Sequence, residues 1–409
     1  MRDLDLRDQN FIRELVLGVT RHKLRLDRII EKYYTGSFSS MEDLLANILR
    51  TGLYQLMFMD SVPDWAAVNE SVELAVRARD RKAGGLVNAI LRRYLRDGEP
   101  LPPADENERL SVVYSHPRWL VDRWLARFGP GTTESMLAAG NEKHPVFIRA
   151  RRERITAEEL SARLRDAGFE TAPIPGAPDY LSVSEGSGLF DSIPFAEGLF
   201  TSQDPSAGMA VDFLDPQPGD SVLDLCAAPG GKSTRCAELM GDFGTVTAVD
   251  VHPGRLDLVR QSAERLGLAS IKTVAGDALT FGRREGKTFD RVLLDAPCSG
   301  TGVFSKRPDM KWRLAEDDIA RLSALQRKML DNAADRVKPG GILVYSTCTL
   351  ERGENEDNVA GFLESHHDFT LDRTGGHTGF VSEGGCLILP HLMHGSGAFT
   401  ARIRRGENG

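Results

Sequence analysis

The chain has 409 residues and a formal net charge of −8 at pH 7, with 41% hydrophobic and 27% charged residues. This length exceeds what one hydrophobic core serves and predicts about two to four domains. The charge excludes a globally basic nucleic-acid binder, so any RNA contact must come from local basic patches. The polar, acidic start "MRDLDLRDQN" excludes a signal peptide, and no apolar run is long enough to span a membrane. We expect a cytoplasmic, monomeric protein without a membrane segment.

The cysteines are five in number, and no two of them have the C-x-x-C spacing. Nor does any set of cysteines and histidines have zinc-binding spacing, so we expect no metal site. Free thiols in a reducing compartment fit this pattern best. Each thiol is then either core filler or a reactive group.

Residues 1–130 predict an all-α bundle. "NFIRELVLGVTRHKLRLDRIIEKYY" places Phe11, Leu15, Val19, Leu26, Ile29, Ile30 and Tyr33 near one stripe at helical spacing. Two later segments repeat the pattern, and no strand-like alternation interrupts it. Residues 131–203 predict a small α+β module that links the bundle to the rest of the chain. "PVFIRARRERI" alternates like a strand, and Thr156 with Glu159 has the pattern of a helix capping box.

Residues 204–409 alternate strand and helix, which predicts a doubly wound parallel sheet. Ligands bind such sheets at the carboxyl ends of the strands. Several residues with chemical potential fall at or just beyond predicted strand ends: Cys226, Asp250, Asp277, Asp295, Cys298 and Cys348. Their convergence at one edge predicts the functional site.

The stretch "DLCAAPGGKST" (Asp224 to Thr234) is a glycine-rich turn between a strand and a helix. It ends like a nucleotide-binding P-loop, but the first glycine of that motif is replaced by Cys226. A P-loop ATPase therefore stays open as a weaker alternative. The other interpretation is a turn that approaches a nucleoside cofactor, with an acidic residue about 20 positions on for the ribose hydroxyls. Asp250 stands there, although a dehydrogenase would share this arrangement.

Two predicted strands end in a cysteine, in "LLDAPC" and in "VYSTC". Carbon 5 of cytosine is a poor nucleophile, but addition of a thiolate to carbon 6 makes it reactive enough to take a sulfonium methyl group. An acid beside the ring helps the addition, and a base must later remove the carbon-5 proton. DNA cytosine methyltransferases use a Pro-Cys nucleophile, which would favour Cys298. The presence of both cysteines favours an enzyme that acts on RNA. For Cys236 and Cys386 we expect buried core thiols.

The motifs "LDLCAAPGGKST", "LLDAPCSGTG", "RPDMKW" and "YSTCTLERGENE" resemble those of RNA 5-methylcytosine methyltransferases of the NOL/NOP/Sun (RsmB-type) family. The resemblance covers the catalytic half and implies a class I, Rossmann-like methyltransferase domain. It implies Cys348 as the nucleophile, Cys298 as the residue that assists product release, and Asp295 as a group that protonates or hydrogen-bonds the base. It also implies S-adenosylmethionine as the cofactor. The residues implied for its binding are Cys226, Ala227, Ala228, Pro229, Gly230, Gly231, Lys232, Asp250, Arg255, Asp277 and Asp295.

The helical segment resembles a NusB-like RNA-binding domain through "GVTRHKLRLDRII", "LRTGLYQLMFMDSVP" and "GLVNAILRRYLR". Its relatives usually have one more helix before this point, so we expect either an incomplete bundle or a start codon that is assigned too late. The combination with the catalytic half resembles bacterial enzymes that methylate a cytosine of small-subunit ribosomal RNA. We therefore expect RNA, and ribosomal RNA in particular, as the partner. A noncatalytic RNA-binding or ribosome-assembly factor on a methyltransferase scaffold is the alternative, which the intact cysteine and cofactor motifs disfavour.

Basic residues gather in three places that could meet RNA phosphates, although solvated charged faces explain the first two equally well. The first cluster comprises Arg77, Arg79, Arg81, Lys82, Arg92, Arg93 and Arg96. The second comprises Arg149, Arg151, Arg152 and Arg154, and the third, near "DAPC", comprises Lys306, Arg307 and Lys311. Trp312 is a further candidate for stacking on a base, or for a place in the core.

Overall fold

The computed structural model describes residues 4–184, 186–284, 286–373, 381–382, 384–392 and 396–407. The chain forms two compact units. The first comprises the chain up to Glu142 together with Arg307–Arg313, and the second comprises Lys143–Lys306 and the chain from Leu314 onward. Among the described residues, no helix is long and apolar enough to cross a membrane.

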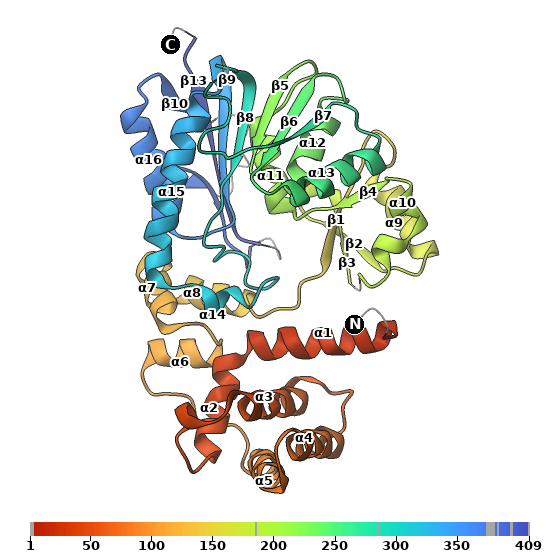
Figure 1. The fold of residues 1–409 in the computed structure, drawn as a ribbon, viewed down its shortest axis with the longest axis vertical. Coiled ribbons are helices and arrows are strands. Elements are labelled where there is room, and N and C mark those ends of the chain that lie inside the picture. Colours follow the sequence, from red (N-terminus) through yellow and green to blue (C-terminus); the bar gives the residue numbers. More distant parts are fainter. Residues whose placement is uncertain are drawn as a thin grey trace. The chain divides into compact units, whose positions relative to one another are not determined.

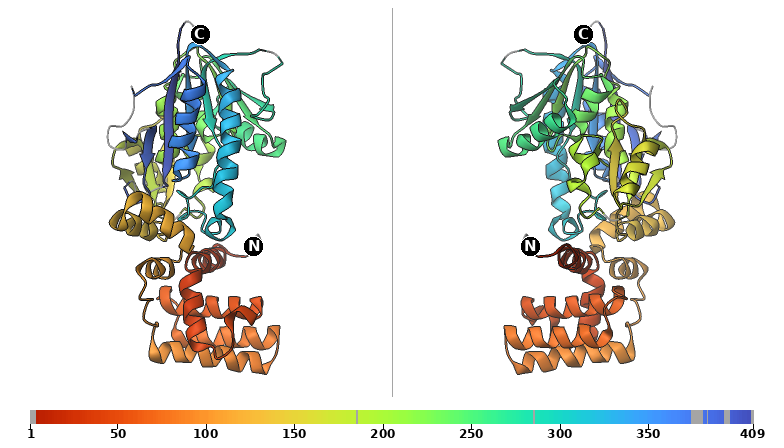
Figure 2. Two further views of the ribbon diagram at one scale, coloured as in Figure 1. Left: turned by 90° about the vertical axis from the view of Figure 1, so that its left-hand side faces the viewer. Right: turned by 90° about the vertical axis from the view of Figure 1, so that its right-hand side faces the viewer.

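Every element in the described part of the first unit is helical (Figure 1). The elements are α1 (Leu6–Arg21), α2 (Lys23–Tyr33), η1 (Phe38–Ser40), α3 (Asp43–Phe58), α4 (Asp64–Ala78), α5 (Arg81–Asp97), α6 (Glu106–Val113), α7 (Arg118–Phe128), α8 (Pro130–Ala139) and α14 (Met310–Arg313). Helices α4 and α5, both orange, lie side by side (Figure 2). Leu26, Ile29, Leu49 and Leu91 are fully buried in the core of this unit.

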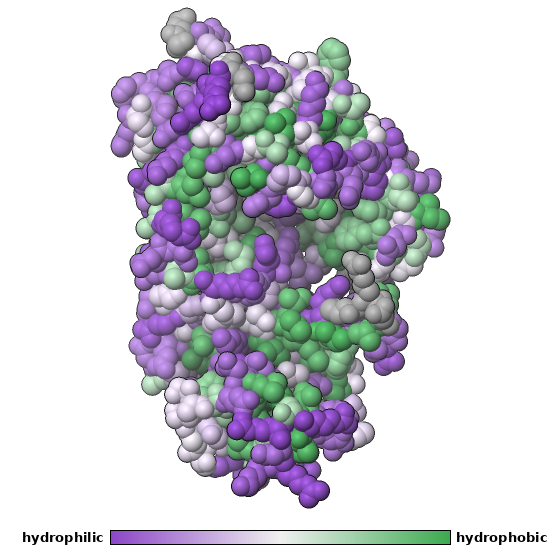
Figure 3. Space-filling view, viewed as in Figure 1, coloured by the Kyte–Doolittle hydropathy of each residue, from purple (hydrophilic) through white to green (hydrophobic). Residues whose placement is uncertain are grey.

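The expectation of one continuous apolar stripe from Phe11 to Tyr33 is wrong. His22 has φ −105° and ψ 18°, so the helix breaks there and α2 starts in a new direction. Ile29 and Ile30 are consequently buried, whereas Phe11 remains 39% exposed. Apolar side chains are visible along α1 in Figure 3, where the exposed ones are Leu6, Phe11 and Val16.

The segment Arg307–Arg313 is part of the helical unit, although it follows "DAPC" in the sequence. Lys311 is only 1% exposed, and its Nζ donates a hydrogen bond to Asn141 Oδ1 at 2.6 Å. Trp312 donates its indole N–H to the carbonyl oxygen of Thr20 at 2.7 Å. The expectation that Lys311 meets RNA is therefore wrong, because its ammonium group is used inside the protein. Burial lowers the pKa of Lys311 well below its ordinary value.

A small antiparallel sheet with the order β2-β3-β1-β4 begins the second unit. Its elements are β1 (Val146–Ala150), α9 (Ala157–Asp166), β2 (Thr171–Ile174), β3 (Ala177–Val183), η2 (Leu189–Asp191), α10 (Ile193–Ala196) and β4 (Phe200–Ser202). The capping box that the sequence predicts at the start of α9 is present, with Thr156 and Glu159 bonded reciprocally. Leu160, Leu164 and Phe200 form the centre of its core and are fully buried.

A second, nine-stranded sheet has the order β11-β12-β13-β9-β8-β5-β6-β7, with β10 paired to β13. Its strands are β5 (Ser221–Leu225), β6 (Thr245–Asp250), β7 (Ile271–Ala275), β8 (Phe289–Asp295), β9 (Val337–Thr347), β10 (Phe369–Leu371), β11 (Val381–Ser382), β12 (Gly385–Ile388) and β13 (Ala398–Arg405). The helical elements between them are α11 (Pro205–Leu214), α12 (Gly231–Leu239), α13 (Pro253–Leu266), α15 (Glu316–Ala334), η3 (Arg352–Glu354) and α16 (Glu356–Ser365).

Helices cover both faces of this sheet (Figure 1). Successive residues of a strand point to opposite faces, so Val292 and Leu294 of β8 pack with α15 and α16, while Leu293 packs with α11 and α12. The doubly wound arrangement of β9, β8, β5, β6 and β7 is parallel, as the sequence predicts. The sheet as a whole is mixed, because β13 adds to β9 in the antiparallel direction.

Candidate active site

The order of the strands creates the site. The chain runs from β5 outward to β6 and β7, and then returns to place β8 on the other side of β5. The carboxyl ends of β5 and β8 therefore flank a point where the strand order reverses, which is where open sheets bind ligands. In register, Leu225 lies beside Val249 and Leu294. The next residue, Cys226, consequently follows β5 at the level where β6 ends at Asp250 and β8 ends at Asp295.

The turn after β5 is shaped by its backbone. Cys226 adopts φ 65° and Gly230 adopts φ 108°, in the left-handed region that glycine enters without strain. A Cβ atom on Gly230 would lie 3.1 Å from Val259 Cα, so a larger residue would push α13 away from the turn. Ala227 N donates to Val249 O at 2.8 Å and ties the turn to β6. Ala227, Ala228 and Gly230 are buried, Gly231 is half-buried, and Pro229 is exposed.

Asp250 closes the turn from the end of β6. Its carboxylate is buried and accepts hydrogen bonds from His252 N at 2.9 Å and Ala228 N at 3.3 Å. Arg255 forms an ion pair with it at 3.4 Å and donates to Ala228 O at 2.7 Å. Asp277, beyond the end of β7, is exposed and accepts from Leu279 N at 2.9 Å. The geometry thus brings Asp250 and Arg255 onto the turn that starts with Cys226.

Asp224, the second-to-last residue of β5, has a buried carboxylate oxygen without a hydrogen-bond partner among the described residues. Its Oδ2 accepts from Ser233 Oγ at 2.5 Å, while Oδ1 has no hydrogen-bond partner among the described residues. Burial raises the pKa of Asp224 to about 7. A cofactor with a cationic group and ribose hydroxyls fits this edge, because the orphaned Asp224 acceptor and the Asp250 carboxylate both favour donors and positive charge.

The two cysteines that the sequence places at strand ends meet. Parallel pairing of β8 with β9 sets Asp295 beside Ser346, and the chains that continue from them bring Cys298 Sγ and Cys348 Sγ to 3.4 Å. Cys348 is exposed and Cys298 is half-buried. By contrast, Cys236 and Cys386 are buried in the core, as expected.

The two thiols differ in acidity. The hydrogen bond from the Cys298 thiol lowers the pKa of Cys348, an effect that outweighs burial and is reinforced by the charge of Lys232. The same hydrogen bond, together with burial, raises the pKa of Cys298 well above its ordinary value. Cys348 is therefore the thiol that ionises first. Cys298 retains its proton and donates a hydrogen bond to the Cys348 sulfur.

Asp295 and Lys232 lie beside the thiols as a half-buried ion pair. Lys232 Nζ lies 2.6 Å from Asp295 Oδ2, and Ser346 Oγ donates to Asp295 Oδ1 at 3.2 Å. Burial lowers the pKa of Lys232, but the charge of Asp295 and its hydrogen bond outweigh burial and raise it. Lys232 therefore remains a cation that links the glycine-rich turn to the end of β8.

Sequence reasoning missed a buried carboxylate between the cysteine segments. Glu354, in η3, is 0% exposed and accepts hydrogen bonds from Ser299 and Thr349, the residues that follow Cys298 and Cys348. The only signal in the sequence was its position six residues after Cys348 in "TCTLERGENE". That segment reads as a charged loop, and nothing local distinguishes the buried Glu354 from its exposed charged neighbours Arg352 and Asp357.

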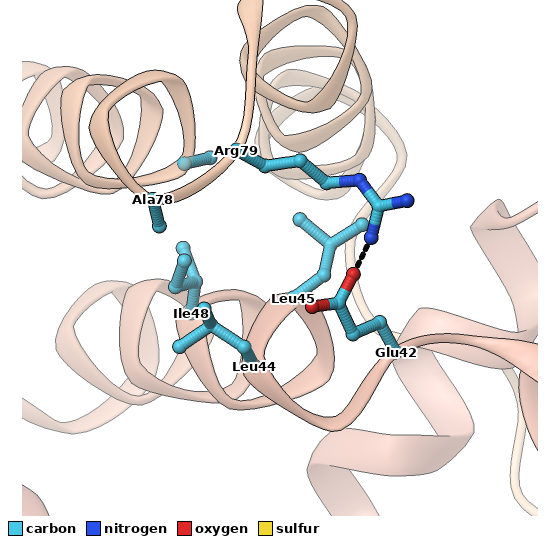
Figure 4. A pocket seen from close by; sticks show the side chains of 7 residues that line it. Glu42, Leu44, Leu45, Ile48, Ala78 and Arg79 are labelled. Carbon is cyan, nitrogen blue, oxygen red and sulfur yellow. Dashed lines mark ion pairs between the residues drawn. The ribbon is translucent and has the colours of Figure 1, made fainter.

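The basic clusters are largely engaged within the protein. Arg79 forms an ion pair with Glu42 at the edge of a small, mostly apolar pocket between α3 and α4 (Figure 4). Arg77 pairs with Glu73, and Arg93 pairs with Asp97. In the second cluster, Arg149 is 2% exposed and pairs with Glu238, so the expectation of an RNA contact there is wrong for this side chain. Lys306 is exposed and forms an ion pair with Asp204.

Comparison with known proteins gives matches along nearly the whole chain. The family model described as "16S rRNA methyltransferase RsmB/F" matches residues 211–404. The NusB family model matches residues 1–96, and an RsmF/B-like ferredoxin-like domain matches residues 116–187. These matches confirm the three-part fold that the sequence predicts.

Individual relatives align over a similar extent. A "Probable ribosomal RNA small subunit methyltransferase B" of Synechocystis is 38% identical over 97% of this chain and 91% of its own length. A protein with the same description from Bacillus subtilis is 35% identical over 98% of this chain and 92% of its own. The crystal structure of PH0851 superposes with a TM-score of 0.83 at 30% identity, over 97% of this chain and 90% of that chain.

The acidity of Cys348 provides a first test. We expect the rate of Cys348 alkylation by iodoacetamide to rise with pH through a midpoint below that of an ordinary thiol, because Cys298 stabilises the thiolate. Cys298→Ala removes that hydrogen bond and should move the midpoint upward. Mass spectrometry of the Cys348 peptide measures the rate, and the Cys226 thiol, whose pKa burial raises to about 12, serves as internal reference. An unchanged midpoint in Cys298→Ala would contradict the assignment of acidity to this contact.

The raised pKa of Asp224 provides a second test, on stability. Between about pH 4 and pH 7 the unfolded chain ionises Asp224 while the folded chain keeps it protonated, so the native state loses stability as pH rises through this window. Asp224→Asn cannot ionise and should escape this loss, which amounts to about 4 kcal/mol above pH 7. Urea unfolding at pH 5 and pH 8, without S-adenosylmethionine, measures the part of this loss that falls between the two pH values, about 3 kcal/mol. Asp335→Asn, at a 61% exposed side chain, is the control and should keep the wild-type loss of stability, because Asp224 is unchanged in it.

Proposed function

The chain belongs to the family of ribosomal RNA small subunit methyltransferases B, and we propose that it methylates carbon 5 of a cytosine through a covalent Cys348–carbon 6 adduct. As a member of that family it is an S-adenosylmethionine-dependent ribosomal RNA methyltransferase. The observation that carries the finer proposal is the pair of cysteine sulfurs 3.4 Å apart at the strand ends, with opposite shifts of their pKa values.

S-adenosylmethionine supplies an electrophilic methyl group on a sulfonium sulfur. We assign its binding to the turn from Cys226 to Lys232, with Asp250 at the ribose hydroxyls and Arg255 closing the turn. Asp277 stands at the next strand end along the sheet and is assigned to the adenine side. The unsatisfied oxygen of Asp224 lies under the turn and leaves an acceptor for a donor group of the ligand.

Cys348 begins the reaction. Its thiolate attacks carbon 6 of the cytosine, and the electron density that reaches carbon 5 makes this atom able to take the methyl group. Asp295, fixed by Lys232 and Ser346, is placed to hydrogen-bond the polar edge of the base. The exposed position of Cys348 leaves its sulfur accessible to a base that enters from outside.

Cys298 takes part at the end of the reaction. Once Cys348 is bonded to carbon 6, its sulfur no longer offers a negative charge to the Cys298 thiol. The largest cause that raises the pKa of Cys298 then disappears, so this thiol releases its proton to solvent more readily, and the resulting thiolate accepts the carbon-5 proton. Loss of that proton restores the ring's double bond and expels the Cys348 thiolate, which releases the methylated RNA.

The reaction class is tested by incubating the full chain with labelled S-adenosylmethionine and unmodified small-subunit ribosomal RNA. We expect 5-methylcytidine after digestion to nucleosides, identified by mass spectrometry. Label in another nucleoside would contradict the cysteine chemistry. Cofactor binding without any labelling, on naked RNA and on small-subunit particles alike, would favour the alternative of a noncatalytic factor. Stabilisation by ATP rather than S-adenosylmethionine in a thermal shift assay would favour the ATPase alternative.

The roles of the two thiols are tested by substitution. Cys348→Ala should abolish methyl transfer and leave cofactor binding intact, because the nucleophile is lost while the turn is untouched. Cys298→Ala should accumulate a covalent protein–RNA adduct, visible as a slow band on a denaturing gel. Cys386→Ala, which removes a buried thiol on β12, is the control and should retain turnover. Full turnover by Cys348→Ala would overturn the nucleophile assignment.

A further inference from the structure

The two cysteine segments share one buried carboxylate. Oε2 of Glu354 accepts hydrogen bonds from Ser299 N at 3.0 Å and from Gln326 Nε2 at 2.8 Å. Oε1 accepts from Ser299 Oγ and, at 3.2 Å, from Thr349 Oγ1. The hydroxyl oxygens of Ser299 and Thr349 themselves lie 2.6 Å apart. A single side chain thus bonds the residue after each of the two cysteines.

Further hydrogen bonds fix the main chain of Glu354 and the side chain of Gln326. The main-chain oxygen of Glu354 accepts from the Tyr345 hydroxyl at 2.6 Å and from Asn358 Nδ2 at 3.2 Å. Gln326, which donates to the carboxylate, also donates to the carbonyl oxygen of Pro297 at 2.9 Å, directly before Cys298. Every one of these residues is buried except Pro297. The contacts therefore connect the rigid sheet and α15 to the cysteine segments.

The next residue braces the second segment alone. Asn355 donates to Thr349 O at 2.9 Å and accepts from Thr347 Oγ1 at 2.6 Å, so it bonds the residues on both sides of Cys348. Among the described residues, the Asn355 side chain makes no such bond to the segment of Cys298. Glu354 is the residue of this pair that reaches both segments.

Burial of a carboxylate is costly unless several donors compensate it. Here four donors do so, and all four come from the cysteine segments or from the residue that supports them. Burial still raises the pKa of Glu354 above its ordinary value. An apolar side chain would fill the same space without this cost, but it would not fix the polar main chain and hydroxyls beside the thiols.

We propose that Glu354 is a positioning residue of the methyl-transfer reaction, which holds the segments of Cys298 and Cys348 in the register that keeps their sulfurs in contact. This inference rests on the proposed function for its catalytic consequence. Its structural part, the spacing of the two thiols, is independent of any substrate.

Substitution by glutamine separates positioning from charge. An amide oxygen in place of Oε2 still accepts from the Ser299 N–H and from Gln326. The amide nitrogen then faces the hydroxyls of Ser299 and Thr349, which are able to rotate and accept. Glu354→Gln should therefore preserve most of the register, whereas Glu354→Ala loses all four bonds. Loss of the negative charge alone would affect both variants equally.

The first experiment measures how fast the two thiols cross-link in the full chain. Diamide, an azo oxidant, takes up the two thiol hydrogens and leaves a Cys298–Cys348 disulfide, which mass spectrometry of the linked peptides quantifies. We expect this rate to fall about tenfold in Glu354→Ala and little in Glu354→Gln, because proximity of the sulfurs sets the effective concentration. Removal of the carboxylate charge alone would act in the opposite direction, since that charge raises the pKa of both thiols.

Two further variants keep the test decisive. Asp357→Asn neutralises a nearby exposed carboxylate whose only ion pair is with Arg352 among the described residues, and it should cross-link like the wild type. Ser299→Ala removes one hydroxyl donor and should slow cross-linking in the same direction as Glu354→Ala but by less. If Glu354→Ala fails to fold by circular dichroism, the Ser299→Ala result decides. If Glu354→Ala folds and cross-links at the wild-type rate, the proposal is overturned. If Glu354→Ala does not fold, a wild-type rate in Ser299→Ala overturns it.

The second experiment follows methyl transfer. Glu354→Ala should lower kcat about 100-fold with the KM for RNA and the Kd for S-adenosylmethionine unchanged, as expected for misplaced reacting groups. Glu354→Gln should recover most of kcat. Equal loss in both variants with normal cross-linking would assign an electrostatic role in place of positioning. The cross-linking assay uses neither RNA nor cofactor, so its failure is distinguishable from failure of the proposed function, which would show as absence of 5-methylcytidine with the wild type.

Discussion

The parallel pairing of β8 with β9 is the constraint on which the site depends. Parallel neighbours end at the same edge of a sheet, so the segments that follow Asp295 and Thr347 leave the sheet together. They are then tied to each other by main-chain contacts, including Gly302 N to Cys348 O at 3.0 Å. A Cβ atom on Gly302 would lie 2.9 Å from that same carbonyl oxygen, so the close approach requires glycine. The meeting of the two sulfurs is thus a consequence of topology and register.

Lys232 is the cation that offsets the carboxylates beside the Cys348 thiol. Asp224, Asp250 and Asp295 all stand at strand ends, where carboxylates raise the cost of ionising a nearby thiol. Lys232 offsets this through its ion pair with Asp295 and through its own attraction for the Cys348 thiolate. Cys226, which lacks such a donor, keeps its proton because burial raises the pKa of its thiol to about 12. The thiols of this edge therefore differ in acidity: the pKa of Cys226 and of Cys298 is raised, and that of Cys348 is lowered.

The features that followed from the sequence are those with a local signal. Strand and helix periodicities predicted the doubly wound core, and strand ends predicted that Asp250, Asp295, Cys298 and Cys348 would converge. Features set by tertiary contacts were missed. The break at His22 interrupts an apolar pattern that continues on both sides of it. The strand β13 is buried at six successive positions and so lacks the alternation that identifies a half-exposed strand.

Buried charged residues show most clearly that features set by tertiary contacts leave no local signal in the sequence. Lys311, Arg149 and Glu354 each stand in a polar stretch of sequence that reads as a surface, yet each is almost fully buried. Their partners are distant in sequence: Asn141 for Lys311, Glu238 for Arg149, and Ser299 for Glu354. No local pattern encodes such pairs, because a buried charge is compensated only by groups that the fold brings to it.

The position of Glu354 connects geometry with acidity. The hydrogen bond between the two thiols is the largest cause of both pKa shifts, and a hydrogen bond to sulfur weakens as its atoms separate. A carboxylate that fixes the cysteine segments therefore also maintains the difference in acidity between their thiols. Its own charge has the opposite effect on the Cys348 thiol, since it raises the pKa of this group. Neither the burial of Glu354 nor its charge favours the Cys348 thiolate, so positioning of the two segments is the contribution that its hydrogen bonds leave to this carboxylate.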